Sequence, residues 1–169
     1  NIYHKEIENI LEISEVVSQK LDNFSVEIYG DGLPSDFDKL EEKINKRGLK
    51  EIIKLMPSVS FSEMQKIQSE RDLLILPREK AEFSDAGFPN KIGEYLASGC
   101  PTVCTAVGEI ENVLSNMENI ILVQPNDNEL FAQVVINTFA NYERAKEIAE
   151  NGRNFIQSFA SPRLVCAQF

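Results

Sequence analysis

Stretches with helical and strand-like hydrophobic patterns alternate along the whole of this 169-residue sequence. Apolar residues spaced three and four apart predict amphipathic helices, and short apolar runs bounded by glycine, proline or asparagine predict strands. Strands that alternate with helices form a parallel sheet with helices on both faces, joined by right-handed crossovers. The sequence therefore predicts an α/β fold, an open Rossmann-like sheet in one domain. The predicted helices cover about residues 3–21, 34–48, 60–70, 89–98, 108–116 and 127–159, and the predicted strands about 25–29, 51–56, 72–77, 101–106 and 119–125.

Local signals place several ends of these elements. Ser35 is the predicted N-cap of the second helix, because acidic residues follow it in the first turn, and Ser60 or Ser62 is the predicted N-cap of the third. The pair at residues 151–152, asparagine and glycine, predicts a break in the last helical stretch. The continuous apolar run at residues 72–77 is typical of a strand buried on both faces.

Composition limits the classes of function. The formal net charge is −10, from 27 acidic and 17 basic residues, which argues against nucleic acid or an anionic membrane as a partner of the whole surface. The single histidine, His4, argues against a histidine-dependent triad or a zinc site, so no metal is expected. Three cysteines without a CxxC pair are typical of reduced thiols and predict a cytoplasmic protein.

The chain starts at Asn1 without an initiator methionine, so we expect residues 1–169 to be part of a longer protein. No apolar run approaches the roughly 20 residues that span a bilayer. A peripheral association of the longer protein with the inner face of a membrane stays open.

The carboxyl ends of parallel strands form the edge where ligands bind in such sheets. The longest segment at this edge is residues 77–89, and a loop of this length in a small domain is more often functional than not. It leads into a helix that has Lys91 in its first turn and no acidic residue before Glu94. Backbone N–H groups, the positive end of the helix dipole, Lys91 and Arg78 together predict a site for phosphate or diphosphate.

Glu94 lies one turn into the same helix, on the face of Lys91. A carboxylate at this place could accept hydrogen bonds from the two hydroxyl groups of a ribose. The alternative interpretation is that Lys91 and Glu94 form a solvated surface ion pair at i, i+3.

The segments GFPNK (residues 87–91), EYLASG (residues 94–99) and PTV (residues 101–103) resemble the signature of the GT-B glycosyltransferases known as group 1, in the glycogen synthase-like superfamily. The segments VEIYGDG, DLLILPRE and the stretch from residue 107 to residue 135 are also similar to this family, so the resemblance covers nearly the whole chain. It implies the C-terminal, donor-binding half of a GT-B fold. The implied donor is a UDP- or GDP-sugar, with no other cofactor.

The resemblance implies roles for individual residues. Lys91 and Arg78 fall where basic catalytic groups meet the donor diphosphate, and Glu94 matches a glutamate that holds the ribose. The implied acceptor is a polysaccharide, a lipid-linked glycan or a small molecule, bound by a separate N-terminal domain. The remaining residues implied in donor binding are Asp85, Ala86, Gly87, Phe88, Pro89, Asn90, Gly30, Ser58 and Val59.

The sequence departs from the family pattern in two places. Many members have a first glutamate eight positions before the second, but Ala86 stands there, next to Asp85. The transferred sugar and the stereochemical outcome therefore stay open. A strand with a glycine-containing loop normally precedes the first helix of this domain, and we expect both to lie outside this chain.

A non-catalytic nucleotide-binding or regulatory domain of the same fold is the alternative function. A receiver-type domain is disfavoured, because residues 77–79 offer no phosphoacceptor aspartate after the third strand.

Overall fold

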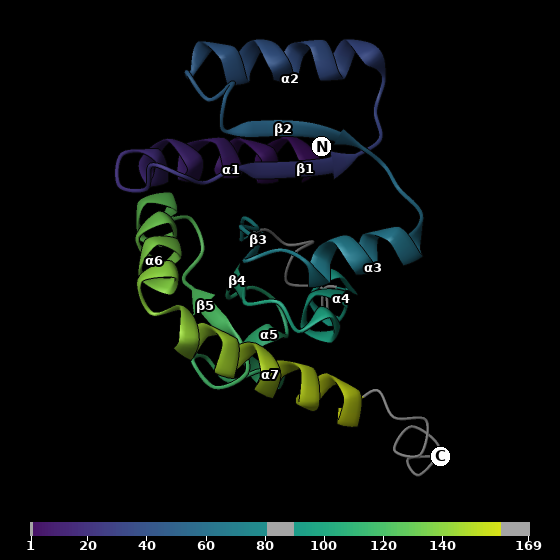
Figure 1. Ribbon diagram of the computed structural model, residues 1–169, viewed down its shortest axis with the longest axis vertical. Coiled ribbons are helices and arrows are strands. Elements are labelled where there is room, and N and C mark those ends of the chain that lie inside the picture. The colour runs from purple at the N-terminus through teal and green to yellow at the C-terminus, as the bar shows by residue number, and fades with distance from the viewer. Residues whose placement is uncertain (1, 81–89, 160–169) are drawn as a thin grey trace.

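The computed structural model describes residues 2–80 and 90–159, over which helices and strands alternate in the predicted order (Figure 1). All paired strands are parallel, so the predicted α/β fold is confirmed. The strands are β1 (Val26–Gly30), β2 (Ile53–Pro57), β3 (Leu74–Leu76), β4 (Thr102–Thr105) and β5 (Ile121–Val123). The helices are α1 (Ile2–Ser18), α2 (Pro34–Lys46), α3 (Phe61–Ser69), α4 (Asn90–Ser98), α5 (Ile110–Val113), α6 (Asn128–Ala140) and α7 (Tyr142–Phe159).

Within the described residues the strands form two sheets rather than the one sheet that the sequence predicts. β1 pairs with β2, and the second sheet has the order β3-β4-β5. The edges of β1 and β3 line the two sides of a cavity of about 950 Å³ and do not pair with each other. Leu74 and Ile75 of β3 are therefore only half-buried, and the prediction that this strand is buried on both faces is wrong for them.

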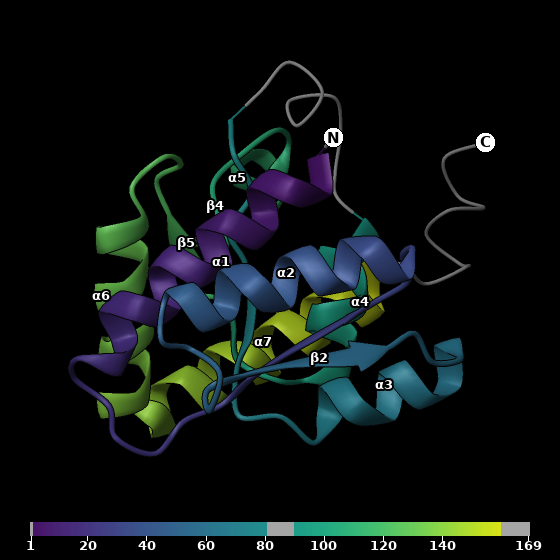
Figure 2. The ribbon, with the colours of Figure 1, turned by 90° about the horizontal axis from the view of Figure 1, so that it is seen from above.

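α1 packs against both sheets and holds them together (Figure 2). Leu11 is completely buried in a cluster with Ile44 of α2 and Ile53 of β2. Ile13 and Val17 are buried in a second cluster with residues of β4, β5, α6 and α7. Full burial of a side chain of this size contributes about 1.5–3 kcal/mol. A third cluster packs α4, α5 and α7 against Leu76 of β3 and the adjoining strand β4.

The helix ends follow the predicted signals in one case and depart from them in another. Ser60 is the N-cap of α3 and forms a capping box with Glu63, as expected for one of the two candidate serines. The prediction that Ser35 caps α2 is wrong. Leu33 is the N-cap, without a side-chain hydrogen bond, because Pro34 takes the first helical position, where its missing N–H costs nothing.

The predicted break at residues 151–152 is also wrong, because α7 continues through them. The helical stretch is interrupted instead at Asn141, between α6 and α7. Gly152 serves close packing instead. A Cβ atom at this position would lie 2.3 Å from the carbonyl oxygen of Asn119 and 2.8 Å from Leu96 of α4.

Among the described helices, none combines the length and the apolar character that a membrane crossing requires.

Candidate functional site

The loops after β1 and β2 bring Gly30, Ser58 and Val59 together at the carboxyl edge of the first sheet. Gly30 lies opposite Pro57 in the parallel register, and the Ser58 hydroxyl donates a hydrogen bond to the carboxylate of Asp31. A Cβ atom at Gly30 would meet no heavy atom within 4 Å, so open space lies beside its α-carbon. These three predicted site residues therefore form one continuous part of the edge.

α4 turns Lys91 and Glu94 away from its buried side. Ile92 and Leu96 are buried against the second sheet, whereas Lys91 is exposed and Glu94 is half-buried. Lys91 and Glu94 both line the cavity between the two sheets. Glu94 forms neither an ion pair with Lys91 nor a hydrogen bond with any other described residue, so the alternative of an ion pair between the two is not observed. Its carboxylate oxygens can therefore accept from a ligand.

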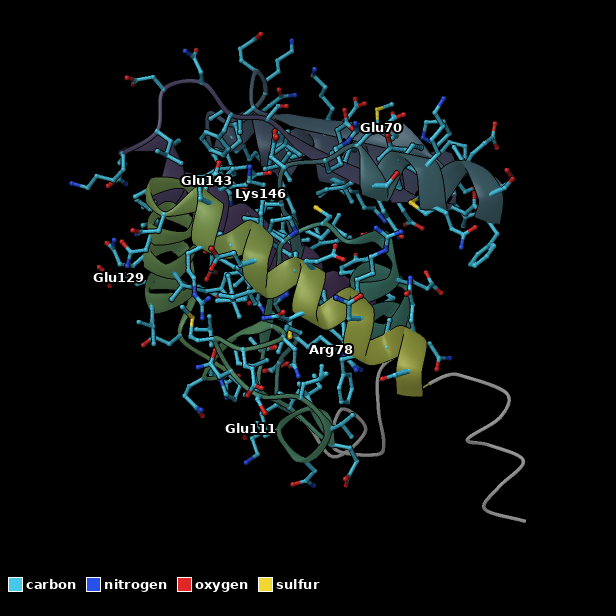
Figure 3. The ribbon with its side chains drawn as sticks, turned by 60° about the horizontal axis from the view of Figure 1, so that its bottom comes forward. Glu70, Arg78, Glu111, Glu129, Glu143 and Lys146 are labelled. Carbon is cyan, nitrogen blue, oxygen red and sulfur yellow. The ribbon has the colours of Figure 1, made fainter. Side chains whose placement is uncertain are left out.

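Arg78 directly follows Pro77 at the end of β3 and is held on several sides. Its Nε lies 3.3 Å from Oε1 of Glu6 on α1, and the two side chains are only 18% and 15% exposed. Its carbonyl oxygen accepts a hydrogen bond of 2.8 Å from the hydroxyl of Thr105 on β4. Asn9 of α1 donates to the carbonyl oxygen of Pro77 at 2.9 Å. Figure 3 places Arg78 toward the middle of the molecule.

Tyr95 lies next to Glu94 and also lines the cavity. Burial raises the pKa of the Tyr95 hydroxyl to about 12, and the negative charges of Glu6 and Glu94 add to this effect. Tyr95 therefore stays neutral at physiological pH.

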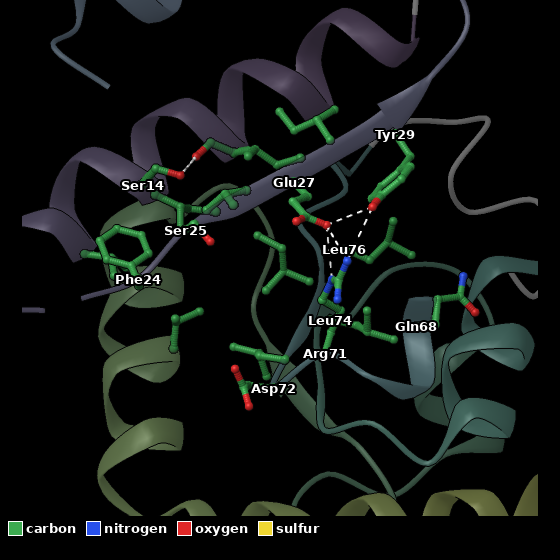
Figure 4. A pocket seen from close by; sticks show the side chains of 18 of the residues that line it. Ser14, Phe24, Ser25, Glu27, Tyr29, Gln68, Arg71, Asp72, Leu74 and Leu76 are labelled. Carbon is green, nitrogen blue, oxygen red and sulfur yellow. Dashed lines mark hydrogen bonds and ion pairs between the residues drawn. The ribbon is translucent and has the colours of Figure 1, made fainter. Parts of the chain in front are cut away.

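A second polar cluster bridges the cavity from β1 to Arg71, which lies three residues before β3 (Figure 4). The carboxylate of Glu27 accepts hydrogen bonds from the Tyr29 hydroxyl at 2.8 Å and from Arg71 Nη2 at 2.7 Å. These hydrogen bonds, that from Tyr29 first, lower the pKa of Glu27 below its usual value, although partial burial opposes them. The cluster links the edges of the two sheets through side chains.

The described residues include no group of three or more histidine, cysteine, aspartate and glutamate side chains that could hold a metal ion. Cys100 and Cys104 are buried, and burial raises the pKa of each thiol to about 12. Neither thiol is therefore a reactive nucleophile at neutral pH.

Several predicted site residues lie outside the part of the chain that the structure describes, namely Asp85, Ala86, Gly87, Phe88 and Pro89. Asn90, which follows them, is exposed at the start of α4. Glu6 and Asn9 contact residues 77–78 at the carboxyl edge, and neither was among the site residues predicted from the sequence. They lie three residues apart in the first predicted helix, and no local pattern in the sequence links them to residues 77–78.

The family model described as "Glycosyl transferases group 1" matches residues 1–141, which is most of the chain. The chain belongs to the group 1 glycosyltransferases. An uncharacterized glycosyltransferase of Methanocaldococcus jannaschii is 24% identical over 143 residues, which cover 85% of this chain and 38% of that protein. This chain thus spans well under half of the length of that group 1 relative.

Solved structures share the fold of this group 1 glycosyltransferase domain. The C-terminal domain of LpcC, a group 1 family protein of Francisella tularensis, is 22% identical with a TM-score of 0.74, over 89% of this chain and 76% of that chain. Anabaena HepE, solved in complex with UDP-glucose, is 18% identical with a TM-score of 0.77, over 94% of this chain and 43% of that chain. Sucrose-phosphate synthase of Thermosynechococcus elongatus is 17% identical with a TM-score of 0.78, over 94% of this chain and 40% of that chain.

Proposed function

We propose that this chain binds the nucleotide-sugar donor for a glycosyltransferase whose acceptor is bound by another part of a longer protein. The observation that carries this proposal is the position of Lys91 and Glu94. In a member of the group 1 family, both line the cavity between the two sheets, which reaches Tyr29 and Pro77 at the carboxyl ends of β1 and β3, and both lie on the side of α4 away from its buried residues. Ligands bind at this edge in open α/β sheets.

The proposed catalytic groups act on the leaving diphosphate. When the bond between the sugar and the diphosphate breaks, negative charge grows on the phosphate oxygen that leaves. Lys91, Arg78 and the N-terminal end of α4 stabilise this charge, and groups fixed before the reaction do so without reorganisation. Interactions that strengthen as the charge develops raise the rate rather than only the affinity.

The proposed binding groups hold the nucleoside. Glu94 accepts hydrogen bonds from the two ribose hydroxyls, which is consistent with a carboxylate that forms no hydrogen bond with the described residues. Gly30, Ser58 and Val59 contact the base, since they form one continuous part of the same edge. Residues 85–90 contact the diphosphate and the sugar, which stays a prediction from the family resemblance.

We propose a UDP-sugar as the first donor to test. HepE, which shares the fold, was solved with UDP and with UDP-glucose. A GDP-sugar stays open, as does the sugar itself. The cytoplasmic location also stays a prediction from the sequence.

The gap between the two sheets supports a proposal about the longer protein. α1 runs roughly antiparallel to β1 (Figures 1 and 2), so a strand leading into α1 would run parallel to β1 and β3. The N–H groups of Val26 and Leu74 bond away from the gap, to Ile52 and Pro101. Because N–H groups alternate sides along a strand, those of Glu27, Tyr29 and Ile75 face the gap. We propose that a strand preceding α1 binds them and joins the two sheets.

The experiment that tests the proposed function uses the full-length protein and a panel of UDP- and GDP-sugars. Calorimetry measures binding of each donor, and a coupled assay measures release of nucleoside diphosphate with and without candidate acceptors. Binding together with acceptor-dependent release is the expected result. Binding without release under any condition would favour the non-catalytic alternative. No binding of any nucleoside diphosphate at millimolar concentration would refute the donor site.

A further inference from the structure

We propose that Glu6 of α1 is a positioning residue for Arg78. It holds the guanidinium group at the carboxyl edge of β3, so that the group can meet the diphosphate of the donor. This inference rests on the proposed function, because it assigns Glu6 a task within the same site.

The ion pair between the two side chains is largely shielded from water. Arg78 Nε lies 3.3 Å from Oε1 of Glu6, and the exposed fractions are 18% and 15%. Salt screens such a pair less than it screens a surface pair. Glu6 engages the Nε side of the guanidinium, and no described residue accepts a hydrogen bond from its two Nη nitrogens. As far as the described part of the chain is concerned, the Nη groups are therefore left for a second anion.

The backbone around Arg78 is fixed as well. Asn9, which lies one turn after Glu6 on α1, donates to the carbonyl oxygen of Pro77 at 2.9 Å. Asn128 at the start of α6 in turn donates to Oδ1 of Asn9 at 3.0 Å. The hydroxyl of Thr105 on β4 donates to the carbonyl oxygen of Arg78 at 2.8 Å. The arginine is thus fixed from α1 and β4, with support from α6, at the place where the donor diphosphate is proposed to bind.

Two roles of Glu6 predict opposite effects on anion binding. If Glu6 only contributed its negative charge to the site, removal of that charge would strengthen the binding of a diphosphate. If Glu6 orients Arg78, removal of the carboxylate lets the guanidinium leave its productive geometry, and diphosphate binding weakens. A preorganised arginine loses less conformational freedom when it binds a phosphate. The sign of the change in affinity therefore distinguishes positioning from simple electrostatics.

The test compares Glu6→Gln, Glu6→Asp and wild-type full-length protein by calorimetry with UDP and with uridine. Glu15→Gln is the matched control, because Glu15 is another α1 carboxylate in an ion pair, with Arg47 at 3.1 Å. We expect Glu6→Gln to weaken UDP binding about tenfold, with uridine binding and the control unchanged. Glu6→Asp keeps the charge but shortens the side chain, so we expect weaker UDP binding here too.

An Arg78→Lys background tests whether Glu6 acts through Arg78. In this background Glu6→Gln should change UDP affinity by less than about twofold, since residues that act as one unit are not additive. If Glu6→Gln binds UDP as tightly as the wild type or more tightly, this inference is overturned and the donor-site proposal is unaffected. An undiminished Glu6→Gln effect in the Arg78→Lys background would also overturn it. A wild-type protein that binds no nucleoside diphosphate would instead refute the donor-site proposal, and this inference with it.

Discussion

Replacement of Gly152 by alanine should destabilise the protein, although alanine favours helices. A Cβ atom there would lie 2.3 Å from the backbone oxygen of Asn119 and 2.8 Å from Cδ2 of Leu96, so the backbone or α7 must shift. Overpacking of this kind costs about 1–3 kcal/mol, and the gain in helix propensity from glycine to alanine returns only about 1 kcal/mol. We expect a net loss of up to about 2 kcal/mol, which corresponds to a fall in Tm of up to about 8 °C.

Gly93 provides the matched control for this substitution. It also lies inside a helix, α4, but a Cβ atom there would meet no heavy atom within 4 Å. Gly93→Ala should therefore raise stability by about 0.5–1 kcal/mol. Thermal and urea unfolding of both variants measure the difference. A Gly152→Ala variant at least as stable as the wild type would refute the argument that this glycine lets α7 pack closely against α4.

Three further predictions address the site and the gap between the sheets. Lys91→Ala should weaken UDP binding about tenfold and leave uridine binding nearly unchanged, as calorimetry at low salt can measure. The pKa of Glu27 is lowered in the folded state, so its ionisation stabilises the protein above the ordinary glutamate pKa of about 4.3 and this contribution is lost as the pH falls below it. Glu27→Gln should therefore be less stable than the wild type at pH 7, and urea unfolding should show a smaller difference near pH 3. In the full-length protein, the amides of Glu27, Tyr29 and Ile75 should exchange hydrogen as slowly as that of Val26, whereas fast exchange of all three would contradict a strand in the gap.

The local patterns in the sequence were sufficient for the order of the elements and for the orientation of α4. Helical spacing alone separates Ile92 and Leu96, which are buried, from Lys91 and Glu94, which line the cavity. The carboxyl edge follows from the βα order, and Gly30 and Ser58 lie at this edge because they end and follow two paired parallel strands. These are local properties, and an amphipathic period or a turn signal carries them directly.

The parts that the sequence did not reveal depend on distant contacts. Glu6 meets Arg78 only because α1 packs over both sheets, and no local pattern links the two residues. The low helix propensity of glycine predicts a helix break at Gly152, whereas the fold uses its missing side chain for packing. The gap between β1 and β3 follows from which strands pair, and hydrophobic patterns do not specify strand partners.

The most direct test of the donor site compares UDP with 2′-deoxy-UDP on the wild-type protein and on Glu94→Gln. If Glu94 accepts hydrogen bonds from the ribose, loss of the 2′-hydroxyl should weaken binding to the wild type about tenfold, because hydrogen bonds to charged groups contribute roughly 1.5–3 kcal/mol. The same loss should matter little to Glu94→Gln, and both proteins should melt at similar temperatures. Equal affinities of the wild type for the two nucleotides, or an equal penalty in both proteins, would contradict the assignment of Glu94 to the donor ribose.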